Sequence, residues 1–139
     1  MRIDHLIFAV SELDDGVAKL EDRFGVRAEG GGQQIGQGTH KKLLALGLTT
    51  YLEIIAPDPA QPEPSGPRPF GVDGVVRSGL VGWAVACDDI DLAVDQACAA
   101  GFDPGDVING RRRTADGTTL TWRITSNARA AGVVPFLIS

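Results

Sequence analysis

The chain has 139 residues, of which 43% are hydrophobic and 22% are charged, a composition typical of one ordinary globular domain. Its net charge of −5 excludes nucleic acid as an expected partner, because an acidic surface repels phosphates. No apolar run approaches the ~20 residues that a membrane helix needs, and we expect a cytoplasmic protein without a membrane partner. Cys87 and Cys98 do not resemble a secreted disulfide framework and are expected to be small buried thiols.

The first part of the chain predicts a strand, a helix and three further strands. Residues 3–10 are rich in β-forming side chains, and Ser11 is placed to cap a helix. Apolar residues at positions 13, 17, 20 and 24 then recur at helical spacing, and Gly25 ends the pattern. The three strands that follow are predicted at 33–38, 42–48 and 50–56.

The same order of elements returns after a connection rich in proline and glycine, residues 57–79. Residues 80–87 predict a strand, and a helical pattern follows in which Val94 superposes on Val17 of the first half. Further strands are predicted at 107–113, 118–125 and 133–138, the first two joined by a turn at Asp116 and Gly117.

This repeat predicts an α+β fold in which two βαβββ modules, residues 1–56 and 80–139, form a curved mixed sheet around a ligand cup. Strand alternation then assigns the faces of that sheet. The bulkier, even-numbered residues of strand 3–10 are expected to pack on the helix, which turns His5 to the opposite face. If Leu52 and Ile54 also pack on the helix, Tyr51 and Glu53 lie on the same face of the sheet as His5. A carboxylate among apolar residues is costly unless it is paired, solvated or metal-bound.

The second half offers different chemistry at the matching places. Gly82 stands where the first half has His5, and the small residues after it leave room for a ligand. In strand 118–125, Arg123 belongs to the polar face and is expected to project into the cup. The basic run at 111–113 is open to two interpretations, a solvated strand end or an anion site, and in the second Arg113 contacts the ligand.

Six short segments, in this order and spacing, resemble the glyoxalase-like domain of the vicinal oxygen chelate (glyoxalase/bleomycin resistance/dioxygenase) superfamily. The resemblance extends over nearly the whole chain, and the segments read DHLIFAV, GTH before a leucine-rich strand, YLEIIAP, PFGVDG, ADGTTLTWR and PFLI. The resemblance implies paired βαβββ modules with a small-molecule ligand between them. Metal enzymes of this superfamily take His and Glu ligands from the first and last strands of each module, and the resemblance implies ligand positions on the same strands of this chain.

Carried over by position, the resemblance places two metal ligands at His5 and Glu53. The third position falls on Gly82, and the fourth falls in the segment Phe136-Leu137-Ile138, so neither supplies a ligand. His40 is a candidate third ligand or ligand-binding residue if its loop folds over the cup. A catalytic metal usually has about three protein ligands. Because the set of His and Glu ligands is incomplete here, the sequence does not decide whether the protein uses a divalent metal as cofactor.

Two functions follow from the resemblance. One is a metal-assisted lyase, isomerase or dioxygenase in which Glu53 is the catalytic residue and His5 and Glu53 hold the metal. The other is a metal-free protein that sequesters a small ligand without catalysis. The ligand-binding candidates in both are His40, Tyr51, Arg113 and Arg123. The superfamily also makes a homodimer plausible, although two modules in one chain make it optional.

Overall fold

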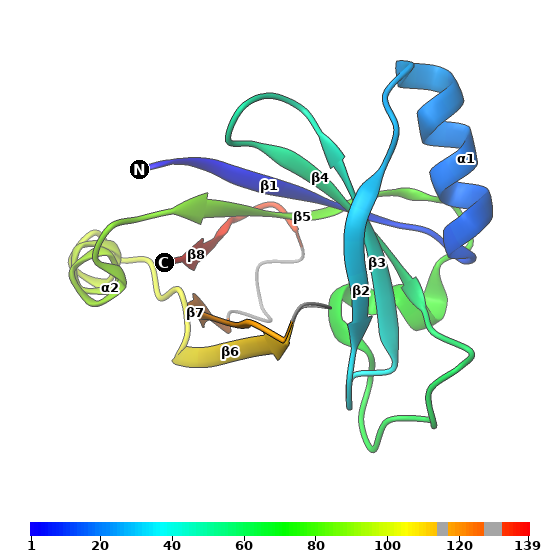
Figure 1. Ribbon diagram of the computed structural model, residues 1–139. Coiled ribbons are helices and arrows are strands. Elements are labelled where there is room, and N and C mark those ends of the chain that lie inside the picture. The colour runs from blue at the N-terminus through cyan, green and yellow to red at the C-terminus, as the bar shows by residue number, and fades with distance from the viewer. Residues whose placement is uncertain (114–116, 127–131) are drawn as a thin grey trace. The chain divides into compact units, whose positions relative to one another are not determined.

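The computed structural model describes residues 1–113, 117–126 and 132–139 and has the predicted order of elements, strand, helix and three strands, twice (Figure 1). The first set consists of β1 (Arg2–Ala9), α1 (Leu13–Phe24), β2 (Glu29–Gln34), β3 (Thr39–Ala45) and β4 (Tyr51–Pro57). A 3₁₀ segment, η1 (Pro69–Gly74), lies in the connection. The second set consists of β5 (Gly79–Ala86), α2 (Ile90–Ala99), β6 (Val107–Arg113), β7 (Thr119–Thr125) and β8 (Phe136–Ile138). The predicted α+β class with two βαβββ modules is confirmed.

The chain divides into two compact units whose boundaries fall inside β1 and β5. One unit, here the first unit, is formed by residues 5–82. The other, here the second unit, is formed by residues 1–4 and 83–139. The connection therefore packs with the first module, and each unit is described by itself.

The first unit holds a mixed sheet in the order β2-β3-β4-β1, covered on one face by α1. β2 and β3 pair antiparallel, as do β3 and β4, whereas β1 runs parallel to β4 with His5 opposite Tyr51 and Ile7 opposite Glu53. Both Leu52 and Ile54 are buried in the core that Leu13 and Leu20 of α1 share with the sheet. The predicted faces of β1 and β4 are thus confirmed.

The ends of α1 are set by local chemistry. The helix is capped by Glu12, whose carboxylate accepts hydrogen bonds from the backbone N–H groups of Asp14 and Asp15 at 3.4 and 2.9 Å. The prediction of Ser11 as the cap is therefore wrong by one residue, because the Glu12 side chain is long enough to accept from both of these N–H groups. Gly25 ends the helix in the left-handed region, at φ +66°, as expected of a C-terminal glycine.

The second unit holds the sheet order β5-β8-β7-β6, with α2 contacting β8. β5 and β8 run parallel, with Val85 opposite Leu137, and β7 pairs antiparallel with β8 and with β6. The helix α2 is capped by Asp89, whose carboxylate accepts a 3.0 Å hydrogen bond from the N–H of Leu92. Of the predicted hairpin turn, Gly117 is described and Asp116 lies outside the described residues.

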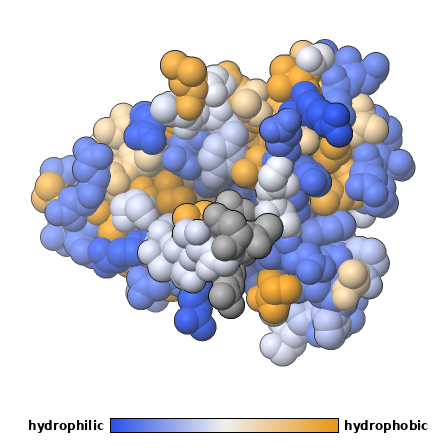
Figure 2. Space-filling model, viewed as in Figure 1, coloured by the Kyte–Doolittle hydropathy of each residue, from blue (hydrophilic) through white to orange (hydrophobic). Residues whose placement is uncertain are grey.

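Several boundaries and exposures differ from expectation. β2 and β3 begin about three to four residues earlier than predicted, because residues 35–38 form the turn between them. Cys87 is half-buried but Cys98 is exposed, so the expectation of two buried thiols is wrong for Cys98. The side chains of Leu48 and Val76 are exposed. Hydrophobic residues lie among hydrophilic ones on the face shown in Figure 2. Within the described residues, no helix has the length and apolarity to cross a membrane.

Candidate functional site

The face of the first unit's sheet that α1 does not cover, here the free face, carries a small polar group in an apolar setting. Alternation and register place His5, Ile7 and Ala9 of β1 on it, beside Tyr51, Glu53 and Ile55 of β4. Ile7, Ala9 and Ile55 are fully buried, and His5 and Glu53 are each 4% exposed. The structure thus brings together three residues that the sequence singled out, His5, Tyr51 and Glu53.

Glu53 is held by a lysine that sequence analysis did not identify. The ammonium of Lys41, on β3, donates a 2.8 Å hydrogen bond to Glu53 Oε2. Lys41 is 15% exposed, and β3 presents it on the free face because its strand partner is Ile55. A strand predicted at 42–48 does not include Lys41. In the observed strand, Thr39–Ala45, alternation places Lys41 on the free face. A buried ion pair adds little stability over apolar side chains, and at an otherwise apolar face it marks a functional candidate.

His5 and Tyr51 form a second side-chain contact on the free face, a stack of two rings. They are strand partners, and their rings stack at 4.8 Å between centroids with 11° between planes. The stack fixes the plane of the imidazole and places the Tyr51 ring against its face. His5 is therefore a buried, orientated side chain on the strand next to Glu53.

An aromatic ring from the connection adjoins this face. The ring of Phe70 comes within 3.6 Å of the point where a Cβ on Gly82 would stand, and Ile7 Cδ1 lies equally close to it. Gly82 is the position that the family resemblance equates with a third metal ligand. In this chain its space is bounded by hydrocarbon from Phe70 and Ile7.

His40 does not join these residues. It lies in β3, not in a loop, and its strand partner Ala56 belongs to the core beneath α1. Alternation therefore turns His40 to the face opposite Lys41 and Glu53. The expectation that a loop folds His40 over the cup is wrong, because the turn between β2 and β3 ends at residue 38 and His40 belongs to β3.

His40 instead faces a buried carboxylate, Asp58, with 3.8 Å between its Nδ1 and Asp58 Oδ1. Asp58 is 2% exposed and accepts hydrogen bonds from Gln33 Nε2 at 2.7 Å, Gln61 Nε2 at 2.8 Å and the N–H of Ala60 at 3.0 Å. Burial raises the pKa of Asp58, but these hydrogen bonds and the nearby His40 outweigh it and leave the pKa below its ordinary value of 3.8. Asp58 thus ties β2, the end of β4 and the start of the connection together.

This lowered pKa predicts a loss of stability in acid. The folded state binds the Asp58 proton less tightly than the unfolded chain, so the stabilisation is complete above about pH 5 and is lost as the pH falls through the folded pKa. Urea unfolding at a series of pH values between about 5 and 3 measures it. Asp58→Asn is the control, and an equally steep acid loss in that variant would assign the effect to other carboxylates.

The arginines predicted at the site lie elsewhere. Arg123 of β7 forms a bidentate ion pair with Asp91 of α2, at 2.7 and 2.8 Å, and this contact holds the pKa of Asp91 below its ordinary value. Arg123 therefore lies on the helix side of its sheet, and the expectation that it projects into the cup is wrong. The backbone of Arg113 pairs with Thr119, and its side chain lies outside the described residues.

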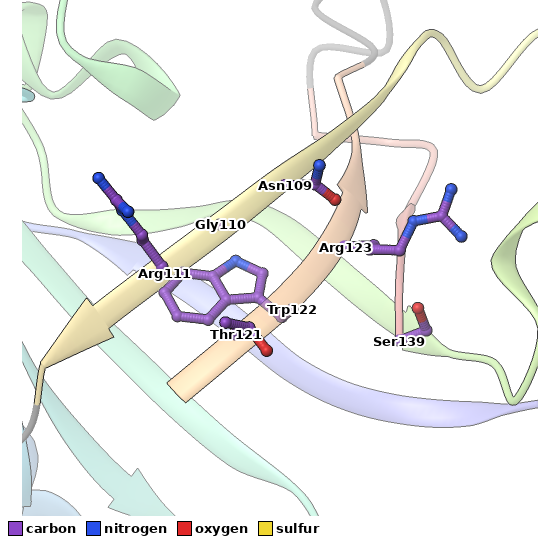
Figure 3. A pocket seen from close by; sticks show the side chains of 7 residues that line it. All are labelled: Asn109, Gly110, Arg111, Thr121, Trp122, Arg123 and Ser139. Atoms are coloured by element: carbon purple, nitrogen blue, oxygen red, sulfur yellow. The ribbon is translucent and has the colours of Figure 1, made fainter. Parts of the chain in front are cut away.

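A hollow of about 720 Å³ lies on the hairpin of the second unit (Figure 3). The residues that line it are Asn109, Gly110, Arg111, Thr121, Trp122, Arg123 and Ser139. The Trp122 indole lies over Gly110, where a Cβ would meet it at 2.1 Å. In Figure 3 the guanidinium groups of Arg111 and Arg123 point away from each other, and Arg123 is already paired with Asp91. The hollow therefore lacks the convergent polar groups of a binding site.

The donor set of the first unit does not fit a divalent metal. His5 and Glu53 share a face, but Glu53 Oε2 is already bound to the Lys41 ammonium. In residues 1–113, 117–126 and 132–139, no group of three or more His, Cys, Asp or Glu side chains is placed to hold an ion. A cation brought to this site would meet two protein ligands and the positive charge of Lys41, fewer ligands than the usual three.

The sequence matches a family model, and the fold is similar to that of solved structures. The family model of the glyoxalase-like domain matches residues 3–139. The structure is similar to methylmalonyl-CoA epimerase from Mycobacterium tuberculosis, with a TM-score of 0.63, 21% identity and 99% of this chain covering 86% of that one. It is also similar to a Streptomyces coelicolor methylmalonyl-CoA epimerase variant in complex with 2-nitronate-propionyl-CoA, with a TM-score of 0.64, 19% identity and coverage of 99% and 96%. A comparison with curated protein sequences found no match. The chain belongs to the family of glyoxalase-like domains.

Proposed function

We propose that the free face of the first unit binds a small organic molecule through an uncharged carbonyl group, without a metal ion. The observation that carries this proposal is the Lys41–Glu53 ion pair, seated among buried apolar residues beside the His5–Tyr51 stack. Proteins of the same fold bind methylmalonyl-CoA and 2-nitronate-propionyl-CoA, which supports a carbonyl compound as the ligand class.

The charge of the pair favours a neutral group over an anion. The charges of Lys41 and Glu53 neutralise each other. A carboxylate on the ligand would therefore be repelled by Glu53 and would find no unpaired cation in the ion pair. The Lys41 ammonium has three N–H donors, and Glu53 is the one partner that the described residues give it. Two N–H groups therefore remain to hydrogen-bond a carbonyl oxygen.

The same geometry supports proton transfer at the carbon next to that carbonyl. The Glu53 carboxylate would accept the proton from carbon, and the electron pair of the broken C–H bond would move onto the carbonyl oxygen. Lys41 would then stabilise the new negative charge by donating a hydrogen bond to that oxygen, in place of a metal ion. Returning the proton to carbon restores both the ion pair and the neutral ligand.

The proposal is tested with propionyl N-acetylcysteamine, a thioester with an acidic C–H beside its carbonyl. We expect it to raise the melting temperature of the protein and to exchange its α-proton in D₂O, observed by NMR. Glu53→Gln keeps a hydrogen-bonding side chain but lowers the exchange rate by about 100-fold or more. Arg123→Gln is the control and leaves both readouts unchanged, because Arg123 pairs with Asp91 in the second unit.

The two readouts separate two versions of the function. Stabilisation without α-proton exchange would favour a protein that sequesters its ligand, a version supported by the incomplete set of metal ligands. The absence of both stabilisation and exchange would contradict the proposal.

A further inference from the structure

Phe70 has a backbone conformation that its side chain does not favour. Its φ is +58° and its ψ is 18°, in the left-handed region, and it is the one non-glycine residue with positive φ among the described residues. A bulky side chain is rare there, and such strain persists where the surrounding structure enforces it. The next residue, Gly71, has nearly the same conformation at φ +65°.

The segment around Phe70 is anchored on both sides of this strained residue. Val72 is 2% exposed. The guanidinium of Arg68 forms ion pairs with Glu63 and Asp73, and its Nε donates a 2.8 Å hydrogen bond to the carbonyl of Gly38. The backbone N–H of Arg68 also donates to Asp73, at 3.0 Å. These contacts hold η1 in place, so the position of the Phe70 ring is built into the fold.

The ring contacts the free face at the place where a side chain is missing. Phe70 Cδ1 and Cε1 lie 3.6 and 3.7 Å from the Cβ position of Gly82, and Ile7 Cδ1 lies 3.6 Å from the same point. Ile7 is the strand partner of Glu53. The Phe70 ring and the strand partner of Glu53 therefore border the same space beside Gly82, and Phe70 is 36% exposed.

We propose that Phe70 is the specificity-determining residue of the site, a fixed aromatic wall that limits the size of the group attached to the ligand carbonyl. This inference rests on the proposed function of the free face and adds to it the source of its selectivity. The Phe70 ring lies beside Gly82 at a distance at which a Cβ on residue 82 would be in van der Waals contact with it. A ligand that fits is one whose acyl group is short enough to lie between Phe70 and the Lys41–Glu53 pair.

The test uses N-acetylcysteamine thioesters of rising size: acetyl, propionyl, hexanoyl and benzoyl. In the native protein, we expect the short members to raise the melting temperature and the hexanoyl and benzoyl members to bind weakly. Phe70→Ala should bind the hexanoyl thioester about tenfold more tightly than the native protein does, because the wall is gone. Val76→Ala, an exposed residue of the same connection, should keep the native order.

The outcomes separate this inference from the proposed function. If short thioesters bind but Phe70→Ala leaves the size limit unchanged, the inference is overturned and the proposed function stands. If no thioester stabilises either protein, both are overturned.

A second pair of variants tests the built-in strain without any ligand. Phe70→Gly removes the ring and also the strain, because glycine adopts a positive φ without steric cost. Phe70→Ala removes the ring but keeps a Cβ in the strained conformation. We expect the Gly variant to melt at a higher temperature than the Ala variant. An equal or lower melting temperature would show that Phe70 is not held in a strained conformation and would contradict a fixed wall.

Discussion

Lys41→Met is expected to lower the free energy of unfolding by about 3 kcal/mol, because it leaves the Glu53 carboxylate in an apolar setting without its cation. Glu53 is 4% exposed, and its strand neighbours on the same face are Ile7 and Leu43. The Lys41 side chain is 15% exposed, so we expect a loss of stability at the lower end of the range for removing one partner of a buried ion pair. Urea denaturation measures it.

A double variant separates the loss of the cation from the loss of packing. Lys41→Met together with Glu53→Leu removes both charges and should recover most of the stability, since an apolar pair can replace a buried ion pair at little cost. Lys42→Met is the matched control on the same strand, exposed and on the other face, with an expected change within about 0.5 kcal/mol. If the single variant at Lys41 is as stable as that control, Glu53 does not depend on the ion pair.

Asp58→Ala is expected to cost about 3 kcal/mol, because it removes the acceptor of three hydrogen bonds in a buried setting. The three donors come from two segments: Gln33 lies in β2, and Gln61 and Ala60 lie in the connection. Their loss should loosen the edge strand and the start of the connection together. Amide hydrogen exchange of β2 should therefore rise along with the loss seen in urea denaturation.

The control for this prediction is another aspartate of the same region. Asp73 is hydrogen-bonded to Arg68 but 43% exposed, and Asp73→Ala should lose less stability than Asp58→Ala. Equal losses in the two variants would mean that the buried network around Asp58 contributes nothing beyond a surface ion pair.

Alternation and the repeat were enough to predict the scaffold and half of the site. The faces of β1 and β4 follow from the bulky even-numbered residues, and that alternation predicts from the sequence alone that His5, Tyr51 and Glu53 share one face. Strand alternation is a local property, which explains why it could be predicted from a single sequence.

The remaining site residues depend on contacts that alternation does not encode. Lys41 was missed and His40 was assigned to a loop because β3 begins at Thr39, three residues before its predicted start, and so includes both residues. The face of Arg123 is set by Asp91, which is 32 residues away in sequence. The position of Phe70 depends on a strained backbone that Arg68 and Val72 hold in place. No periodic pattern indicates such long-range contacts.

The most direct test of the binding face is methyl NMR of protein labelled at its isoleucines, titrated with propionyl N-acetylcysteamine. Ile7 and Ile55 lie on the free face next to Glu53 and Lys41, whereas Ile54 lies in the core beneath α1 and Ile90 lies in the second unit. We predict that the Ile7 and Ile55 signals shift with the thioester while those of Ile54 and Ile90 stay in place. Signals of Ile7 and Ile55 that do not move, or shifts confined to the second unit, would contradict a binding site on the free face.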